Sequence, residues 1–347
     1  MVIPSLDGAA RVVSLYVFIA GITIAVWVWA LVAFQGYPLL WGTALLAYTF
    51  GLRHAVDADH IAAIDNVTRK LMQEGQRPIG VGFFFSLGHS TTMVGLSIAI
   101  AATSVALQNR FELFKDIGGV IGTSVSAFFL LTIAAANLLI LASVYRTFRI
   151  VRAGGSYTDE DLDLILSRRG FFGRIFRRLF RLIKKSWHMY PLGFLFGLGF
   201  DTATEVGLLG ISATEASKGL PIWSIMIFPA LFTVGMVLVD TTDSILMLGT
   251  YGWAFVKPIR KLYYNMTVTF VSVVVAVLIG GIEALGLIGG QLKLQGVLWD
   301  AIDFLNANFG MLGFMVIGVF ALSWLASLMI YRLKRYDDIE VPTGPAT

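Results

Sequence analysis

Residues 53–61 read RHAVDADHI and place two histidines and two aspartates inside a run that is otherwise apolar from Leu39 to Ile64. A run of this length and composition predicts a membrane span. Ionisable side chains at membrane depth cost at least about 2.5–3.5 kcal/mol each, so they persist where they pair, bind an ion or line a water-filled path. The stretch therefore predicts a helical membrane protein with a polar site inside the bilayer.

The chemistry of the polar side chains in this stretch allows two interpretations. Imidazole nitrogens and carboxylate oxygens are ligands that first-row divalent metals accept, so the cluster predicts a metal site. Its candidate ligands are His54, Asp57, Asp59 and His60. In the alternative, Arg53 pairs with Asp57 and the histidines cap helix ends, which gives a self-neutralised polar group.

The spacing of these residues predicts an irregular helix. At about 100° per residue, a straight helix places His54, Asp57 and His60 on one side. Asp59 then points to the opposite side, so a straight helix cannot bring all four side chains together. Either Asp59 makes another contact, or the helix unwinds here, as transporter helices do around ion sites. Gly51, just upstream, is a candidate place for the break.

The whole chain has the composition of a polytopic α-helical membrane protein. Of its 347 residues, 57% are hydrophobic and only 14% are charged. Several apolar runs reach about 20 residues, the length that spans a bilayer. We therefore expect an all-α fold in a single transmembrane transporter domain covering residues 1–347. The eight expected spans are residues 12–34, 39–66, 79–107, 117–145, 189–214, 221–250, 263–289 and 309–331.

The absence of cysteine limits the chemistry of the chain. Without cysteine there are no disulfides, no thiolate metal ligands and no thiol electron transfer. Any metal chemistry must therefore use the four histidines and the carboxylates.

The charges of the connecting segments predict the orientation. With both termini cytoplasmic, 21 of the 26 Lys and Arg residues lie inside, 4 lie outside and Arg53 lies in the membrane. Cytoplasmic loops of membrane proteins carry an excess of Lys and Arg, so we expect the N-terminus and the C-terminus to be cytoplasmic. Membrane topology accounts for the net charge of +4, so nucleic acid is not implied as a partner.

The longest cytoplasmic segment, residues 146–188, carries eleven basic residues. Its apolar residues at 172, 175, 176, 179, 180 and 183 are spaced as on one face of a helix. This pattern predicts a basic amphipathic helix that lies on the anionic inner leaflet. The expected partner of this loop is therefore the lipid bilayer, and the sequence carries no signal for the oligomeric state.

Two pairs of short strings suggest an internal repeat. FGL occurs at 50–52 and 196–198, and FSLGH at 85–89 is echoed by FTVGM at 232–236. The offsets are 146 and 147 residues, which is nearly constant. The second and fifth spans cross the membrane in opposite directions, so the second to fourth spans would match the fifth to seventh as an inverted repeat. Inverted repeats with polar groups at their interface are typical of secondary transporters.

The four polar motifs of the chain, taken in order, resemble the signatures of the nickel/cobalt transporter (NiCoT) permease family. They are RHAVDADHI at 53–61, LGHST at 87–91, GLGFDTATE at 197–205, and GM with DTTD at 235–236 and 240–243. The motifs cover roughly residues 50–245, and the eight-span layout covers the remainder.

The resemblance implies uptake of Ni²⁺, Co²⁺ or both across the cytoplasmic membrane, with the ion as substrate, no cofactor and no enzymatic activity. It implies that His54, Asp59 and His60 form the metal-recognition element and that His89 joins them. It also implies that the acidic residues of the fifth and sixth spans line the pathway or support the ligands. These are Asp201, Glu205, Asp240 and Asp243.

The family pattern leaves alternatives open. It emphasises Asp59, whereas helix geometry favours Asp57, so both stay as candidate carboxylate ligands and local unwinding is expected. Efflux members of the wider group tend to carry a histidine-rich cytoplasmic loop. Residues 146–187 contain no histidine, which favours uptake over a divalent-metal efflux carrier of the same fold. An intramembrane metalloenzyme is a further alternative, and the chain lacks the His-Glu-x-x-His pair typical of one.

Overall fold

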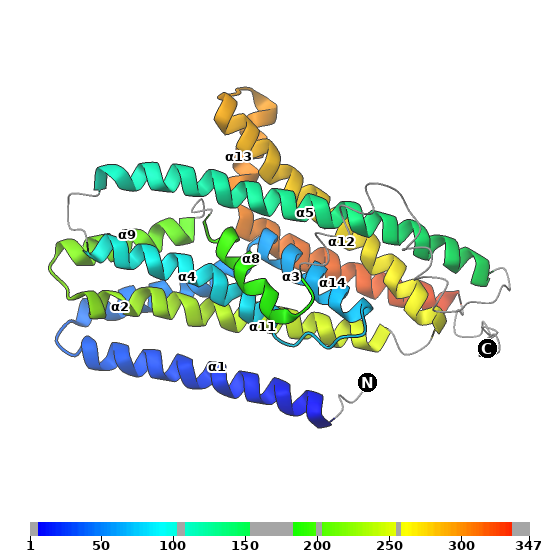
Figure 1. Cartoon of the computed structure of the whole chain (residues 1–347), viewed down its shortest axis with the longest axis horizontal. Coiled ribbons are helices and arrows are strands. Elements are labelled where there is room, and N and C mark those ends of the chain that lie inside the picture. Colours follow the sequence, from blue (N-terminus) through cyan, green and yellow to red (C-terminus); the bar gives the residue numbers. More distant parts are fainter. Residues whose placement is uncertain (1–5, 103–107, 153–182, 199–202, 255–257, 335–347) are drawn as a thin grey trace.

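The computed structural model describes residues 6–102, 108–152, 183–198, 203–254 and 258–334. Within these ranges the regular elements are helices, with no strand (Figure 1). The α-helices are α1 (Leu6–Ala33), α2 (Pro38–His54), α3 (Ala58–Gln73), α4 (Val81–Ala102), α5 (Gln108–Arg152), α8 (Met189–Phe196), α9 (Ala203–Ser217), α10 (Ile222–Ile225), α11 (Ile227–Ala254), α12 (Pro258–Leu292), α13 (Val297–Ala307) and α14 (Phe309–Leu333).

Six helices in the described part of the chain are long and apolar enough to cross a membrane, namely α1, α4, α5, α11, α12 and α14. The predicted all-α membrane architecture is therefore confirmed. The other two predicted spans, residues 39–66 and 189–214, are instead pairs of shorter helices, α2 with α3 and α8 with α9.

The break in the second predicted span lies inside the polar stretch. α2 ends at His54, α3 begins at Ala58, and Asp57 has an extended backbone with φ −66° and ψ 145°. The expectation that the chain breaks at Gly51 is wrong, because the helix continues through this residue. A Cβ atom on Gly51 would lie 2.0 Å from the carbonyl oxygen of Phe232, so this glycine lets α2 and α11 pack closely.

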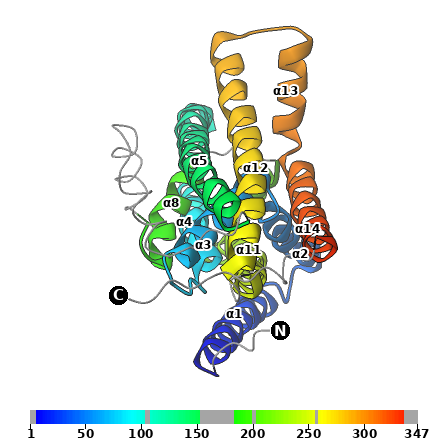
Figure 2. The ribbon, with the colours of Figure 1, turned by 90° about the vertical axis from the view of Figure 1, so that its right-hand side faces the viewer.

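α3 is the most enclosed helix of the bundle and packs against α4, α5, α11, α12 and α14. Seen end-on in Figure 2, it lies in the middle, while α1 and α13 lie at opposite edges. Its side chains from Ile61 to Leu71 are buried, including the charged Arg69. The guanidinium of Arg69 donates to Thr269 Oγ1 of α12 at 2.8 Å and to Asn66 Oδ1 of α3 itself at 3.0 Å, and these bonds stabilise the buried charge.

The predicted basic loop of residues 146–188 is described only at its two ends. Its first residues continue α5 as far as Arg152, and Ser186–His188 form a short 3-10 helix. The segment for which an amphipathic helix is predicted, residues 153–182, lies outside the described residues.

Candidate metal centre

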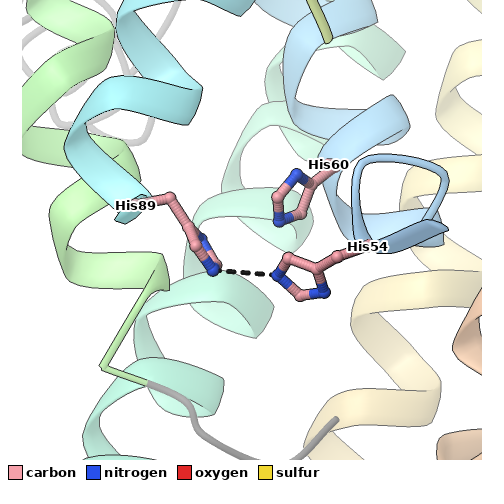
Figure 3. Close-up of side chains that lie close together, drawn as sticks. All are labelled: His54, His60 and His89. Carbon is pink, nitrogen blue, oxygen red and sulfur yellow. Dashed lines mark hydrogen bonds between the residues drawn. The ribbon is translucent and has the colours of Figure 1, made fainter. Parts of the chain in front are cut away.

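Three histidines converge in the core of the bundle (Figure 3). His54 is the last residue of α2, His60 lies in the first turn of α3, and His89 lies in the middle of α4. One ligand nitrogen from each ring can be chosen so that all three lie within 4.8 Å of one another, and the side chains are only 0–3% exposed. The break between α2 and α3 lets two histidines from one predicted span face a third from the next.

Glu205, on α9, contacts two of the three histidines. Its Oε1 lies 3.0 Å from His89 Nε2 and 3.6 Å from His54 Nε2, and the two Nε2 atoms are 2.9 Å apart. Nitrogens bound at about 2.0–2.1 Å to one ion, at a right angle, are roughly 2.9 Å apart. The observed spacing therefore fits adjacent ligands of one metal ion, and it equally suits an N–H···N hydrogen bond between the rings.

Two buried carboxylates contact the opposite nitrogens of these rings. Asp57 Oδ2 lies 2.8 Å from His54 Nδ1, and Asp240 Oδ2 lies 3.3 Å from His60 Nδ1. An imidazole that donates Nδ1–H to a carboxylate keeps its Nε2 lone pair for a metal. Among the described residues, His60 Nε2 has no hydrogen-bond partner. The arrangement thus presents Nε2 atoms to a common space.

The remaining predicted site residues lie away from the histidine cluster or outside the described residues. Asp59 is half-buried in the first turn of α3 and does not belong to the group of converging ligand atoms. Asp243 lines a separate cavity further along α11. Asp201 lies outside the described residues. His188 packs against the ring of Trp187, with centroids 4.2 Å apart, and is not part of the cluster.

Two further residues contact the site but were missed by reasoning from the sequence. The Ser86 hydroxyl donates to Asp240 Oδ2, and Thr204 Oγ1 lies 3.4 Å from His54 Nδ1. Ser86 comes three residues before His89 in an apolar helix, so its spacing on the histidine face was an available signal.

The structure also bears on the alternative of a self-neutralised polar group. That interpretation required Arg53 to pair with Asp57 and the histidines to cap helix ends. In the structure Asp57 contacts His54 instead, and the side chain of Arg53 is exposed. The convergence of His54 with His60 and His89 is the arrangement expected of ligands.

Comparison with known proteins identifies the family. A sequence model of the NicO family, described as high-affinity nickel-transport protein, matches residues 40–330. The chain belongs to the NicO family. The matched range includes the break between α2 and α3 and every residue of the cluster, and the relatives described below are transport proteins rather than enzymes.

Several curated proteins are similar to this chain over most of their length. A high-affinity nickel transport protein of Cupriavidus necator is 61% identical over 332 residues, covering 96% of this chain and 95% of the relative. The nickel transporter NicT of Mycobacterium tuberculosis is 48% identical, and the match covers 88% of this chain and 82% of that protein. The cobalt transport protein NhlF of Rhodococcus rhodochrous is 41% identical, and the match covers 84% of this chain and 83% of that protein. No solved structure matches this chain.

Proposed function

We propose that this protein is a secondary transporter that imports Ni²⁺, Co²⁺ or both across the cytoplasmic membrane. The observation that carries the proposal is the meeting of three buried histidines and Glu205 at the break between α2 and α3. Nitrogen and oxygen ligands suit first-row divalent ions, and interrupted helices are how secondary transporters form ion sites within the membrane. The names of the relatives, nickel for some and cobalt for another, support the same two ions.

In this proposal four atoms hold the ion. They are the Nε2 atoms of His54, His60 and His89 and the Oε1 atom of Glu205. The distances of 2.9–3.6 Å among three of these atoms support a shared ion, as does the lack of a partner for His60 Nε2 within the described residues. Glu205, which the sequence suggested for the pathway, is thereby assigned as a ligand.

The aspartates of the site act in two ways. Asp57 and Asp240 hold the rings of His54 and His60 in place by accepting their Nδ1–H groups. Asp59 does not converge with the ligand nitrogens, yet it lies close enough to His54 and His60 to act on them electrostatically.

We further propose that the chain crosses the membrane eight times as an inverted repeat, with α2/α3 and α8/α9 as two interrupted spans. The starts of α3 and α9, Ala58 and Ala203, are 145 positions apart, and those of α4 and α11, Val81 and Ile227, are 146 apart. These offsets agree with the 146 and 147 of the sequence motifs. The excess of basic residues in alternate loops supports cytoplasmic termini.

Matching helix crossings support the same repeat. A Cβ on Gly88 of α4 would lie 1.9 Å from the carbonyl oxygen of Tyr190 on α8. A Cβ on Gly235 of α11, the counterpart in the second motif, would lie 2.7 Å from the carbonyl oxygen of Tyr48 on α2. In both halves the motif glycine therefore permits close packing against the first part of an interrupted span.

Transport by the purified protein is the direct test. In proteoliposomes we expect saturable accumulation of radioactive nickel or cobalt, accelerated by an inside-negative potential. The potential favours entry of the ion by about 2.3 kcal/mol per charge per 100 mV. Protein-free liposomes provide the background, and competition with Zn²⁺, Mn²⁺ and Cu²⁺ measures selectivity. No accumulation of either ion, or net export under this potential, would exclude the proposed import.

The ligand type predicts a pH dependence of binding. Imidazole binds a metal only when neutral and has an unperturbed pKa of about 6.5, so protons compete with the ion. As the pH falls from about 7.5 to about 5.5, the affinity for Ni²⁺ is expected to fall, approaching roughly tenfold per pH unit for each histidine that must lose a proton. Equilibrium binding to the detergent-solubilised protein measures this, and an affinity that is constant or rises towards acid would argue against histidine ligands.

A further inference from the structure

A cavity that contains a few polar side chains lies near the histidine cluster. The cavity has a volume of about 300 Å³ and lies between α11, α12 and α14. Most of its lining is apolar, but Asp243, Thr250, Thr267, Ser323 and Ser327 also line it. The C-terminal ends of α11 and α14 and the N-terminal end of α12 lie together at one end of the bundle (Figure 1). The polar residues Thr250, Thr267 and Ser327 all lie in the parts of these helices nearest that end.

Asp240 connects this cavity with the histidine cluster. The Oδ2 atom of Asp240 contacts His60 Nδ1. Asp240 also lies three positions before Asp243 on α11, so the side chains of Asp240 and Asp243 are neighbours on one helix face. Asp240 is fully buried, and its Oδ1 accepts no hydrogen bond from any described residue. The same holds for Asp243 Oδ2, which is also buried. Two neighbouring carboxylates with unsatisfied oxygens repel each other unless a cation or a proton lies between them.

We propose that Asp243 is a release site, to which the transported ion binds on its way out of the histidine cluster. We also propose that the cavity beside it is a water-filled vestibule open to the cytoplasm. This inference rests on the import function and the orientation proposed above. The divalent ion leaves the histidine cluster past Asp240, binds at Asp243 as it regains water, and enters the vestibule. Carboxylate oxygens suit this step because they bind a divalent ion together with waters.

The volume of the cavity and the polar side chains among its mostly apolar lining support this role. Six waters occupy roughly 180 Å³ in the liquid, so a cavity of about 300 Å³ can admit a hexahydrated ion. A carboxylate facing lipid would lose its hydration without compensation, whereas one facing water keeps it. The hydroxyls of Thr250 and Ser327 add polar contacts along the same side, towards the end of the bundle where the basic residues predict the cytoplasm.

The absence of native cysteine allows a clean test of the vestibule. Ser323→Cys puts a thiol on the cavity wall, and Leu322→Cys puts one on the adjacent residue, which is 68% exposed on the bundle surface but does not line the cavity. A membrane-impermeant thiol reagent added from the cytoplasmic side should modify Ser323→Cys at least about tenfold faster, because thiols react as thiolates and a lipid-facing thiol stays protonated. Equal rates, or no reaction of Ser323→Cys, would show that the cavity holds lipid and overturn the proposal.

The role of Asp243 is tested by separating binding from turnover. In Asp243→Asn we expect Ni²⁺ binding in detergent to stay within about twofold of wild type and the transport rate to fall at least about tenfold. Asp243→Glu should recover part of the rate, and Asp303→Asn, on the exposed face of α13, should change neither quantity. An unchanged transport rate in Asp243→Asn, or loss of its Ni²⁺ binding, would overturn the proposed role of Asp243 as a release site. Failure of the wild type to accumulate either ion would instead overturn the import function, and the labelling result would still stand.

Discussion

His54→Ala, His60→Ala and His89→Ala are each expected to abolish saturable Ni²⁺ uptake while the protein still reaches the membrane. The three rings are nearly equidistant, with centroids 4.7–4.8 Å apart, so each supplies a ligand that no neighbour replaces. Changing residues that only orient a ligand typically costs 10–100-fold in metal affinity, so losing a ligand nitrogen should cost more than about 100-fold. Equilibrium Ni²⁺ binding and proteoliposome uptake measure both effects.

Two variants serve as matched controls for this experiment. His188→Ala removes the fourth histidine, which packs on Trp187 away from the cluster, and should leave binding unchanged. Asp57→Asn keeps all three rings but replaces the carboxylate that contacts His54, so an intermediate loss of about 10–100-fold is expected. Normal binding and uptake by all three alanine variants would refute the ligand assignment. Variants that fail to reach the membrane would instead favour a structural role of the cluster.

Gly313→Ala is expected to disrupt the site without touching a ligand. Gly313 lies on α14, where an added Cβ would come 1.5 Å from the carbonyl oxygen of Val56 in the break between α2 and α3. This neighbour is backbone and cannot rotate away, so the segment that carries Asp57 must shift. Overpacking of a tight interior costs about 1–3 kcal/mol, and misplacement of His54 adds a loss of metal affinity. We therefore expect a lower unfolding temperature together with weaker Ni²⁺ binding.

Gly318→Ala provides the comparison on the same helix, because a Cβ there would meet nothing within 4 Å. It should bind Ni²⁺ like wild type and unfold at the same temperature or slightly higher, since alanine favours a helix over glycine. If Gly313→Ala matched Gly318→Ala in both binding and unfolding temperature, the close contact between α14 and the break would not matter for the site.

Packing also explains which features of the fold were difficult to predict. α13 was not expected, because its eleven residues are too few to span a bilayer and hydropathy reports only long apolar runs. Gly51 was expected to break the second span, since glycine weakens a helix. It lies within α2 instead, because its contact with α11 requires a residue without a side chain.

The sequence alone determined the class of the protein and predicted the three histidines of its candidate site, His54, His60 and His89. Membrane helices were predictable because spanning a bilayer is a local property of about 20 apolar residues. His54 and His60 were predictable for a similar reason, since ionisable groups in such a run need a function whatever surrounds them. The need for a break near them also followed from the angle between successive residues on a helix.

Only the tertiary structure decided which atoms meet. His89 and Glu205 are 116 positions apart, and they approach to 3.0 Å only because α4 and α9 pack together. The contrast between Asp57, which contacts His54, and Asp59, which does not join the cluster, depends on backbone angles at the break that residue types do not fix. Distances across a site arise from the packing of whole helices, and the spacing of residues along one span carries no information about them.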